Sequence, residues 1–397
     1  MGNPILVEPD TELIRDVMEA GGGDLKKCFQ CATCASTCSL SPEEGTFPRR
    51  QMLLAQWGMK KELLKDPAPW LCFYCGECSK TCPRGANPGE TMMGLRRYLT
   101  TQYDWTGLSR LMYRSAFWEI GTLALVAAMV VALFTLPESF GFGLLSRSGP
   151  LPLSNVMLDK FAPKAMVHLG DAIMAALLSL LLVINAARMF LGLTRDDRIP
   201  ARFYFARIGS LIVHGVTQMQ WKNCKDRDAS RNWIRHLFLV SGYATIFTLV
   251  VVFLPWFQIE NSSFHWTSVL GYYSTAILLV TTGWIVLDRI GKRTEMHRFS
   301  HLSDWLFPIL LFLTAATGIL LNVFRLLNLP MPTYVTYVVH MAIAVPMLVV
   351  EVPFGKWSHL LYRPLGIFVA TVQRQTKARE SASRQAAVAG PALAGNG

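Results

Sequence analysis

The chain has 397 residues, of which 52% are hydrophobic, and its net charge is +11. This composition excludes an ordinary soluble protein, because long apolar runs with few charges dominate from Phe117 onward. Lysines and arginines gather in alternate loops between those runs, which indicates a membrane protein rather than a nucleic-acid-binding surface. The first 115 residues are polar and contain eight of the nine cysteines. The sequence therefore predicts a polar N-terminal domain followed by a membrane domain.

The polar region is predicted to be mostly helical, since it shows no alternating β pattern. Glu12–Glu19 is a short amphipathic helix candidate. Phe47–Leu64 has Pro48 near its start and good helix formers after it, and Pro88–Thr100 follows the second cysteine group. No secretory signal precedes the cysteines. We therefore expect the cysteines to lie in the reducing cytoplasm, where structural disulfides are rare.

Both cysteine groups follow the pattern C-x2-C-x2-C-x3-C, as CFQCATCASTC and CFYCGECSKTC. Three thiolates in a tight loop can hold three corners of a four-iron cluster, and the fourth cysteine of such a run ligates the other cluster. The predicted ligands are Cys28, Cys31, Cys34 and Cys82 for cluster one, and Cys72, Cys75, Cys78 and Cys38 for cluster two. Zinc and disulfides are the alternatives, but zinc motifs usually use pairs of cysteines. The ninth cysteine, Cys224, has no partner in the sequence.

Six apolar runs follow, each long enough to cross a bilayer. They are Phe117–Leu136, Ala165–Leu193, His236–Phe257, Ser268–Leu287, Trp305–Phe324 and Tyr334–Val352. The loops on one side carry nineteen lysines and arginines and those on the other side carry four, which predicts a multi-pass protein of the cytoplasmic membrane with both termini in the cytoplasm. Ile208–Val216 is too short to cross and is expected to lie on the membrane surface.

The predicted fold is all-α, a helical two-cluster ferredoxin domain followed by a six-helix transmembrane bundle. The expected boundaries are 1–115 for the cytoplasmic iron–sulfur domain, 116–365 for the haem b domain and 366–397 for a disordered cytoplasmic tail. Ser381–Gly397 is rich in Ala, Gly and Ser, which favours disorder.

Histidines inside the spans are the candidate haem ligands, because haem b needs two axial imidazoles from different helices. His340 lies inside the sixth run and His359 just beyond its inner end. Matching depths predict that His236 pairs with His359 and that His168 pairs with His340. The alternative for each is a buried histidine bonded to a helix carbonyl, or one at the headgroup boundary.

Other polar residues near the spans are weaker candidates. Asp171 lies three residues from His168 on the same helix face, where it could orient the ring or accept a proton from quinol. Depth alone adds His265 and Lys164 as quinone contacts. His214 is the main substitute ligand. His297 and His301, in a charged inner loop, are expected to be solvated.

Two stretches resemble known families. Residues 24–100, with WLCFYCGECSKTCPRG and FPRRQMLL, resemble the small iron–sulfur C-subunit of heterodisulfide reductase. The last five spans resemble the haem b gamma subunit of respiratory nitrate reductase, through VVHMAIAVPMLVVEVPFGKWSHLLYRP and RHLFLVSG. That resemblance implies ligands at His236, His340 and His359. The family has a second histidine where this chain has Ile246, so either His168 replaces it, giving two haems, or only one haem is bound.

The fusion of both modules over residues 24–365 is similar to the membrane-embedded C-subunit of the quinone-interacting membrane-bound oxidoreductases of sulfate-reducing and some sulfur-oxidising organisms. The resemblance implies menaquinone as substrate, the flavin- and iron–sulfur-containing A and B subunits as partners, and adenylylsulfate reductase as the eventual acceptor. The chain itself shows no strand followed by G-x-G-x-x-G. We therefore expect an electron-transfer subunit. The alternatives are a heterodisulfide-reductase-like or sulfite-linked quinone oxidoreductase, and a non-redox membrane anchor.

Overall fold

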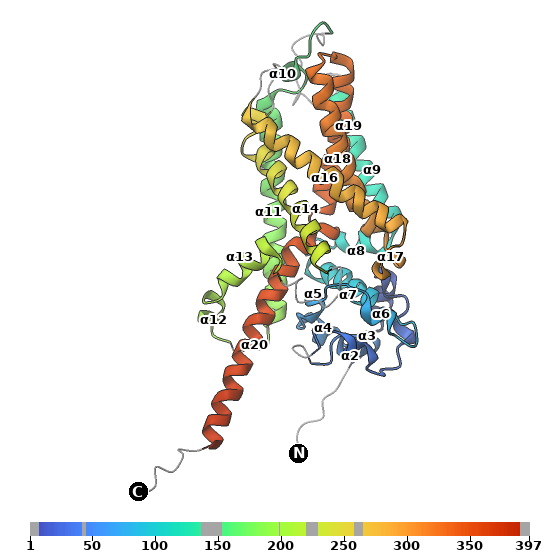
Figure 1. The fold of residues 1–397 in the computed structure, drawn as a ribbon, viewed down its shortest axis with the longest axis vertical. Helices are drawn as coiled ribbons and strands as arrows, with labels where there is room; N and C mark the ends of the chain where they lie inside the picture. The colour runs from blue at the N-terminus through green and yellow to red at the C-terminus, as the bar shows by residue number, and fades with distance from the viewer. Residues whose placement is uncertain are drawn as a thin grey trace, which may run out of the picture.

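The computed structural model describes residues 8–41, 45–135, 153–197, 199–219, 229–257 and 265–389. Every regular element in these ranges is a helix, so the all-α prediction is confirmed. Long helices form an elongated bundle, and the short N-terminal helices gather beneath one end of it (Figure 1). We call this end the cluster side of the bundle and the opposite end the far side. Cys224 lies outside the described residues.

The N-terminal domain is built from short helices. They are α1 Thr11–Val17, α2 Thr33–Thr37, α3 Arg49–Gln56, α4 Lys60–Leu64, α5 Ala68–Leu71, α6 Glu77–Lys80, α7 Pro88–Tyr103 and α8 Leu108–Arg114, with the single turns η1 Met18–Gly22 and η2 Leu25–Lys27. The helix expected over Phe47–Leu64 is divided at Gly58, whose φ is +68°. A Cβ at Gly58 would lie 2.6 Å from the carbonyl oxygen of Asp10, so this turn requires glycine.

Six helices are long and apolar enough to cross a membrane, which confirms the six predicted spans within the described residues. They are α9 Ala116–Thr135, α11 Lys164–Thr194, α14 Ala229–Val251, α16 Trp266–Ile290, α18 Leu302–Leu326, and α19 Pro330–Pro346 continued by the turn η6 Met347–Glu351. Shorter helices connect them: α10 Leu158–Phe161, α12 Ala201–Phe205, α13 Ile208–Thr217, α15 Leu254–Phe257 and α17 Glu295–Arg298. After η6, the chain forms the turn η7 Lys356–Ser358 and then the last helix.

The prediction of a disordered tail from residue 366 is wrong for its described part. Helix α20 runs over His359–Ala389, and Phe368 and Val369 are buried in the core of the iron–sulfur domain. The disorder was predicted from the composition of the last residues. The apolar face at the start of the helix packs against the iron–sulfur domain, and the sequence of the tail alone does not show this contact. Residues 390–397 lie outside the described ranges.

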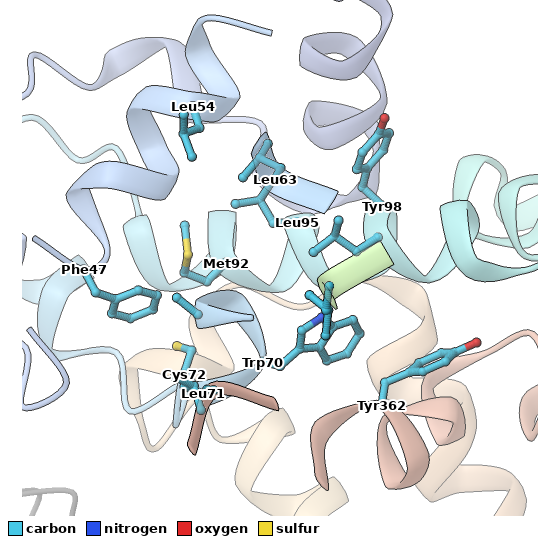
Figure 2. Packing of buried hydrophobic residues seen from close by; sticks show 14 of the residues in the cluster. Phe47, Leu54, Leu63, Trp70, Leu71, Cys72, Met92, Leu95, Tyr98 and Tyr362 are labelled. Carbon is cyan, nitrogen blue, oxygen red and sulfur yellow. The ribbon is translucent and has the colours of Figure 1, made fainter. Parts of the chain in front are cut away.

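The iron–sulfur domain shares one hydrophobic core with two helices of the membrane half. Trp70 lies at its centre, with its ring centroid 5.5 Å from that of Tyr362 in α20 (Figure 2). Met189 and Leu193, from the last turns of α11, belong to the same core. The domain is therefore packed rigidly against the cluster side of the bundle, because buried side chains from both parts interlock.

Candidate functional site

Each cysteine group is a loop wound by two residues with left-handed backbone. These are Gln30 and Ala32 in the first group, with φ of 60° and 69°, and Tyr74 and Gly76 in the second, with φ of 56° and 84°. They occupy the same two positions, between the first three cysteines of each group. The left-handed residues curl the chain, and a short helix, α2 or α6, then carries the third cysteine in its first turn.

The two groups are related by an approximate two-fold axis. Thr37 and Thr81, each nine residues after the first cysteine of its group, lie with their hydroxyl oxygens 3.4 Å apart. Equivalent residues can contact each other in this way only near such an axis. The fourth cysteine of each group follows directly, so the symmetry carries it toward the opposite loop.

The thiols fall into two sets that follow the predicted exchange. Cys34 interacts electrostatically with Cys28, Cys31 and Cys82, and these four side chains line one pocket. The second set joins Cys38 to Cys72 and Cys75, with Cys78 facing all three. The eight cysteines are free thiols.

The two thiol sets have the chemistry of iron–sulfur cluster ligands. Burial raises the pKa of Cys34 to about 11 and that of Cys38 to about 12, so these thiols ionise at neutral pH only when a metal replaces the proton. The donor sets therefore fit two [4Fe-4S] clusters.

Hydrogen-bond donors surround the cysteine sulfurs. The Tyr74 amide lies 3.4 Å from Sγ of Cys72, and the Ala86 amide lies 3.4 Å from Sγ of Cys82. Donors to the sulfurs raise the reduction potential of an iron–sulfur cluster, because they stabilise the added negative charge. Arg96 fixes the backbone beside the second set by donating to the carbonyl oxygens of Trp70 and Cys72, at 3.0 and 2.6 Å.

The structure brings His236 and His359 together at the cluster side of the bundle. Their ring centroids are 6.4 Å apart. An imidazole nitrogen lies about 2 Å from a bound first-row metal and about 1 Å from its own ring centre, so two axial imidazoles have centres roughly 6 Å apart. Nδ1 of His359 lies 2.5 Å from the carbonyl oxygen of Lys356. This pair therefore fits the axial ligands of one haem.

The second predicted pair shows no ring contact in the described part of the chain. Nδ1 of His340 lies 2.9 Å from the hydroxyl oxygen of Thr317. His168 is exposed near the start of α11, and no hydrogen bond or ring contact within the described ranges joins it to His340. The start of α11 does lie beside α19, since Val167 packs in one hydrophobic cluster with Val338 and Met341, so the pairing stays a prediction.

The three quinone candidates do not form one site. Lys164 begins α11, where its backbone N–H donates to Asp159 at 2.9 Å, and Asp171 is half-buried two turns later. His265 is the N-cap residue of α16 and lies 2.9 Å from the hydroxyl oxygen of Thr267. No contact between His265 and either α11 residue occurs in the described part of the chain.

The histidine pair adjoins the second cysteine set. Arg363, one turn after His359, lies with its guanidinium carbon 5.9 Å from the ring centroid of Phe73. Phe73 directly follows Cys72 in the loop of the second set. The start of α20 therefore contacts the loop that would hold cluster two.

A buried ionic network, which the sequence did not reveal, joins this loop to the bundle. Arg97 donates to Glu90 at 3.0 Å and to Asp304 of α18 at 2.8 Å, and Lys356 also pairs with Asp304. Tyr74, from the loop itself, donates to Glu90. Although burial opposes it, the charges of Asp304 and Glu90 raise the pKa of Arg97 above its usual value. The one sequence signal for this network was an acidic residue, Asp304, at the start of an apolar run.

The prediction that His297 and His301 are solvated is wrong. His297 is only 5% exposed, and His301 is half-buried and caps α18 by accepting from the Ser303 amide at 3.3 Å. The iron–sulfur domain covers this loop, since a Cβ on Gly76 would lie 2.9 Å from that of Glu295. Burial, with nearby arginines, lowers the pKa of both histidines to about 4.

Comparison with known proteins agrees with the arrangement of the cysteines in the N-terminal domain. Residues 24–86 match the 4Fe-4S dicluster domain family. A protein of Archaeoglobus profundus described as like the heterodisulfide reductase C-subunit is 36% identical over 88 residues, which are 22% of this chain and 47% of that protein. The C-subunit of the H(2):CoB-CoM heterodisulfide,ferredoxin reductase of Methanothermobacter thermautotrophicus is 37% identical over 75 residues, 19% of this chain and 40% of the relative.

The C-subunit of the ferredoxin:CoB-CoM heterodisulfide reductase of Methanosarcina mazei is 33% identical over 87 residues, 22% of this chain and 53% of the relative. The chain spans about half the length of the curated relatives it matches. No solved structure gives a significant match. The chain is therefore a multi-pass membrane protein whose N-terminal domain is similar to the iron–sulfur domain of the heterodisulfide reductase C-subunit.

Proposed function

We propose that the chain is the membrane electron-transfer subunit of a quinone oxidoreductase, linking menaquinone to a cytoplasmic flavoprotein partner through b haem and two [4Fe-4S] clusters. The observation that carries this proposal is the His236–His359 pair, 6.4 Å apart and next to the loop of Cys72. When bound, the haem and the clusters exchange single electrons, while the protein sets their ligation, spacing and burial.

The side chains divide this work. His236 and His359 would hold one haem at the cluster side, and the Lys356 carbonyl would orient the second ring. Cys72, Cys75, Cys78 and Cys38 would hold cluster two beside it, and Cys28, Cys31, Cys34 and Cys82 would hold cluster one beyond. His340 is the candidate ligand for a second haem, with His168 its proposed partner, and Asp171, His265 and Lys164 are candidate quinone contacts on the far side.

The partner would dock beside cluster one. Cys31 is exposed, and the neighbouring Phe29 is 68% exposed beneath the guanidinium of Arg84, at 4.1 Å from the ring centroid. An exposed aromatic and arginine next to a redox group are typical of a contact that a partner buries. This arrangement supports an electron path from the bundle through cluster two to cluster one and outward.

The fusion of the two modules supports the A and B subunits of a quinone-interacting oxidoreductase as the partners and adenylylsulfate reductase as the acceptor. It also supports a boundary near residue 115, and the charge asymmetry of the loops supports cytoplasmic termini. The test is reduction of the clusters by a menaquinol analogue in the purified complex, followed by electron paramagnetic resonance. Reduction in the wild type, and its loss in Cys75→Ser, are expected. If quinol still reduced the complex as a whole at the normal rate in Cys75→Ser, the result would favour the non-redox anchor.

One observation favours a second function. The curated relatives of the iron–sulfur domain are subunits of heterodisulfide reductases, so the chain could serve a related or sulfite-linked quinone oxidoreductase. Co-purification decides between the two. Recovery with a thiol–disulfide catalytic subunit, and without flavoprotein partners, would support the second function.

A further inference from the structure

A cavity of about 370 Å³ lies between α12 and α20, apart from the cysteine and histidine sites. Its principal lining side chains are Arg202, Phe203, Arg207, Gln375, Thr376 and Arg379. Three arginines and an amide are hydrogen-bond donors, and guanidinium groups match the geometry of phosphate oxygens. The lining is therefore suited to an anion.

Three positive side chains line this one cavity. The guanidinium carbons of Arg202 and Arg379 lie 5.3 and 5.4 Å from the same ring centroid, that of Phe203. In the part of the chain that the structure describes, no carboxylate forms an ion pair with Arg202, Arg207 or Arg379. An anion bound in the cavity would be stabilised by these positive charges.

The cavity lies beside the end of the span α11. Gln373, on the turn of α20 that borders the cavity, donates to the carbonyl oxygen of Leu193 in the last turn of the span α11, at 3.3 Å. Helix α12 follows that span after a few residues. The arginines therefore lie close to the end of a membrane-spanning helix on the cluster side.

Helix α13, next to the cavity, carries an exposed apolar stripe. Ile208, Ile212 and Val216 are spaced by four residues and are all exposed, and Phe205 at the end of α12 is exposed beside them. Residues four apart share one helix face. A short helix with one exposed apolar face, flanked by arginines at the end of a span, is typical of a helix lying in the membrane interface.

We propose that this cavity binds the headgroup phosphate of an anionic phospholipid, held by Arg202, Arg207 and Arg379, with the acyl chains lying against the apolar stripe of α13. The positive charges favour an anionic lipid over a zwitterionic one. The bound lipid would fix α12 and α13 against α20, which packs into the core of the iron–sulfur domain.

The test compares lipid binding by the delipidated full-length protein, measured by native mass spectrometry with phosphatidylglycerol and with phosphatidylcholine. The wild type is expected to prefer phosphatidylglycerol. The double variant Arg202→Gln/Arg379→Gln is expected to lose about 30-fold in that preference, from about 1 kcal/mol for each arginine. The matched control Lys292→Gln/Arg293→Gln removes two exposed charges from another loop on the cluster side and should retain the preference.

Other outcomes would overturn the proposal. They are an unchanged preference in the Arg202/Arg379 variant, an equal loss in the control, or displacement of the lipid by millimolar inorganic phosphate, which would indicate a site for a free anion. A variant that keeps its lipid preference but loses its partner subunits would assign the arginines to protein docking. The variant Arg202→Lys/Arg379→Lys keeps the charge and should recover most of the preference, which separates lost binding from misfolding.

Discussion

His359 has two ring nitrogens with different surroundings. Nδ1 lies against the Lys356 carbonyl oxygen, so it must carry the proton and donate. Nε2 then keeps its lone pair and can bind a metal. A carbonyl that orients a ligating histidine and raises its basicity is a recurrent feature of metal sites.

The variant His359→Ala should therefore lose the haem at the cluster side. We expect the b-type band of the reduced-minus-oxidised spectrum to fall, while cluster iron and acid-labile sulfide stay at the wild-type level. The matched variant His214→Ala removes the other histidine considered as a ligand and should keep the full band. Loss of the band in His214→Ala and its retention in His359→Ala would make His214 the ligand and contradict the pairing of His359 with His236.

The buried His297 and His301 predict a dependence of stability on pH. Their pKa is about 4 in the folded protein and about 6.5 in an unfolded chain. Between these values the unfolded state binds more protons, so the free energy of unfolding falls as pH falls from about 6.5 toward 4. Thermal unfolding of the full-length protein at pH 7.5, 6 and 5 measures this loss.

The variant His297→Asn/His301→Asn supplies the control, because asparagine can also cap α18 but does not titrate. Its thermal midpoint should change less over the same pH range than that of the wild type. An identical pH profile in both proteins would show that other groups cause the loss.

At the scale of residues, the cysteines were predictable and the pairing of the histidines was only partly so. Spacing determines which thiols can converge, because the loop of each group is local. The partner of His359 followed from depth, and His236 is indeed its neighbour. The partner of His340 depends on which helices touch, and no local pattern encodes that contact.

At the scale of elements, the contact between α20 and α5 is very close. A Cβ on Gly366 would lie 2.6 Å from Cβ of the buried Trp70, so even alanine requires the two elements to separate. We expect Gly366→Ala to lower the free energy of unfolding of the iron–sulfur domain by about 1–3 kcal/mol. A chemical denaturation series of the full-length protein in detergent measures this change.

The control for this variant is Gly121→Ala in α9, where the added Cβ meets no atom within 4 Å. It should leave stability unchanged or raise it slightly, since alanine favours helix. Equal stability of Gly366→Ala and the wild type would mean that α20 does not pack on α5 as described.

The spans were predictable as elements, because long apolar runs with few charges have no other stable fold in this chain. Helix α20 could not be predicted in the same way, since its buried residues pack against the iron–sulfur domain. The division of Phe47–Leu64 at Gly58 was also missed, because the turn depends on a contact with the distant Asp10.

At the scale of the whole molecule, Asp304 joins the two halves. Its carboxylate pairs with Arg97 of the iron–sulfur domain and with Lys356, and its side chain is almost fully buried. Asp304→Asn would leave the buried Arg97 and the half-buried Lys356 with no carboxylate at this position. We expect a loss of about 3–5 kcal/mol in the free energy of unfolding, measured by denaturation in detergent.

The exposed pair between Arg298 and Glu295 is the matched control. Arg298→Gln should change stability by no more than about 0.5 kcal/mol, because exposed ion pairs contribute little. A similar loss in both variants would mean that the Asp304 network does not hold the halves together. The sequence could not predict this network, as its members are far apart in the chain.

The most direct test of the electron-transfer account is the cofactor content of the purified full-length protein. The electron-transfer account predicts about eight non-haem irons and eight acid-labile sulfides per chain, from two [4Fe-4S] clusters. It also predicts at least one b haem, which His359→Ala removes. Iron without acid-labile sulfide, or a protein with both clusters and no b-type band, would contradict it.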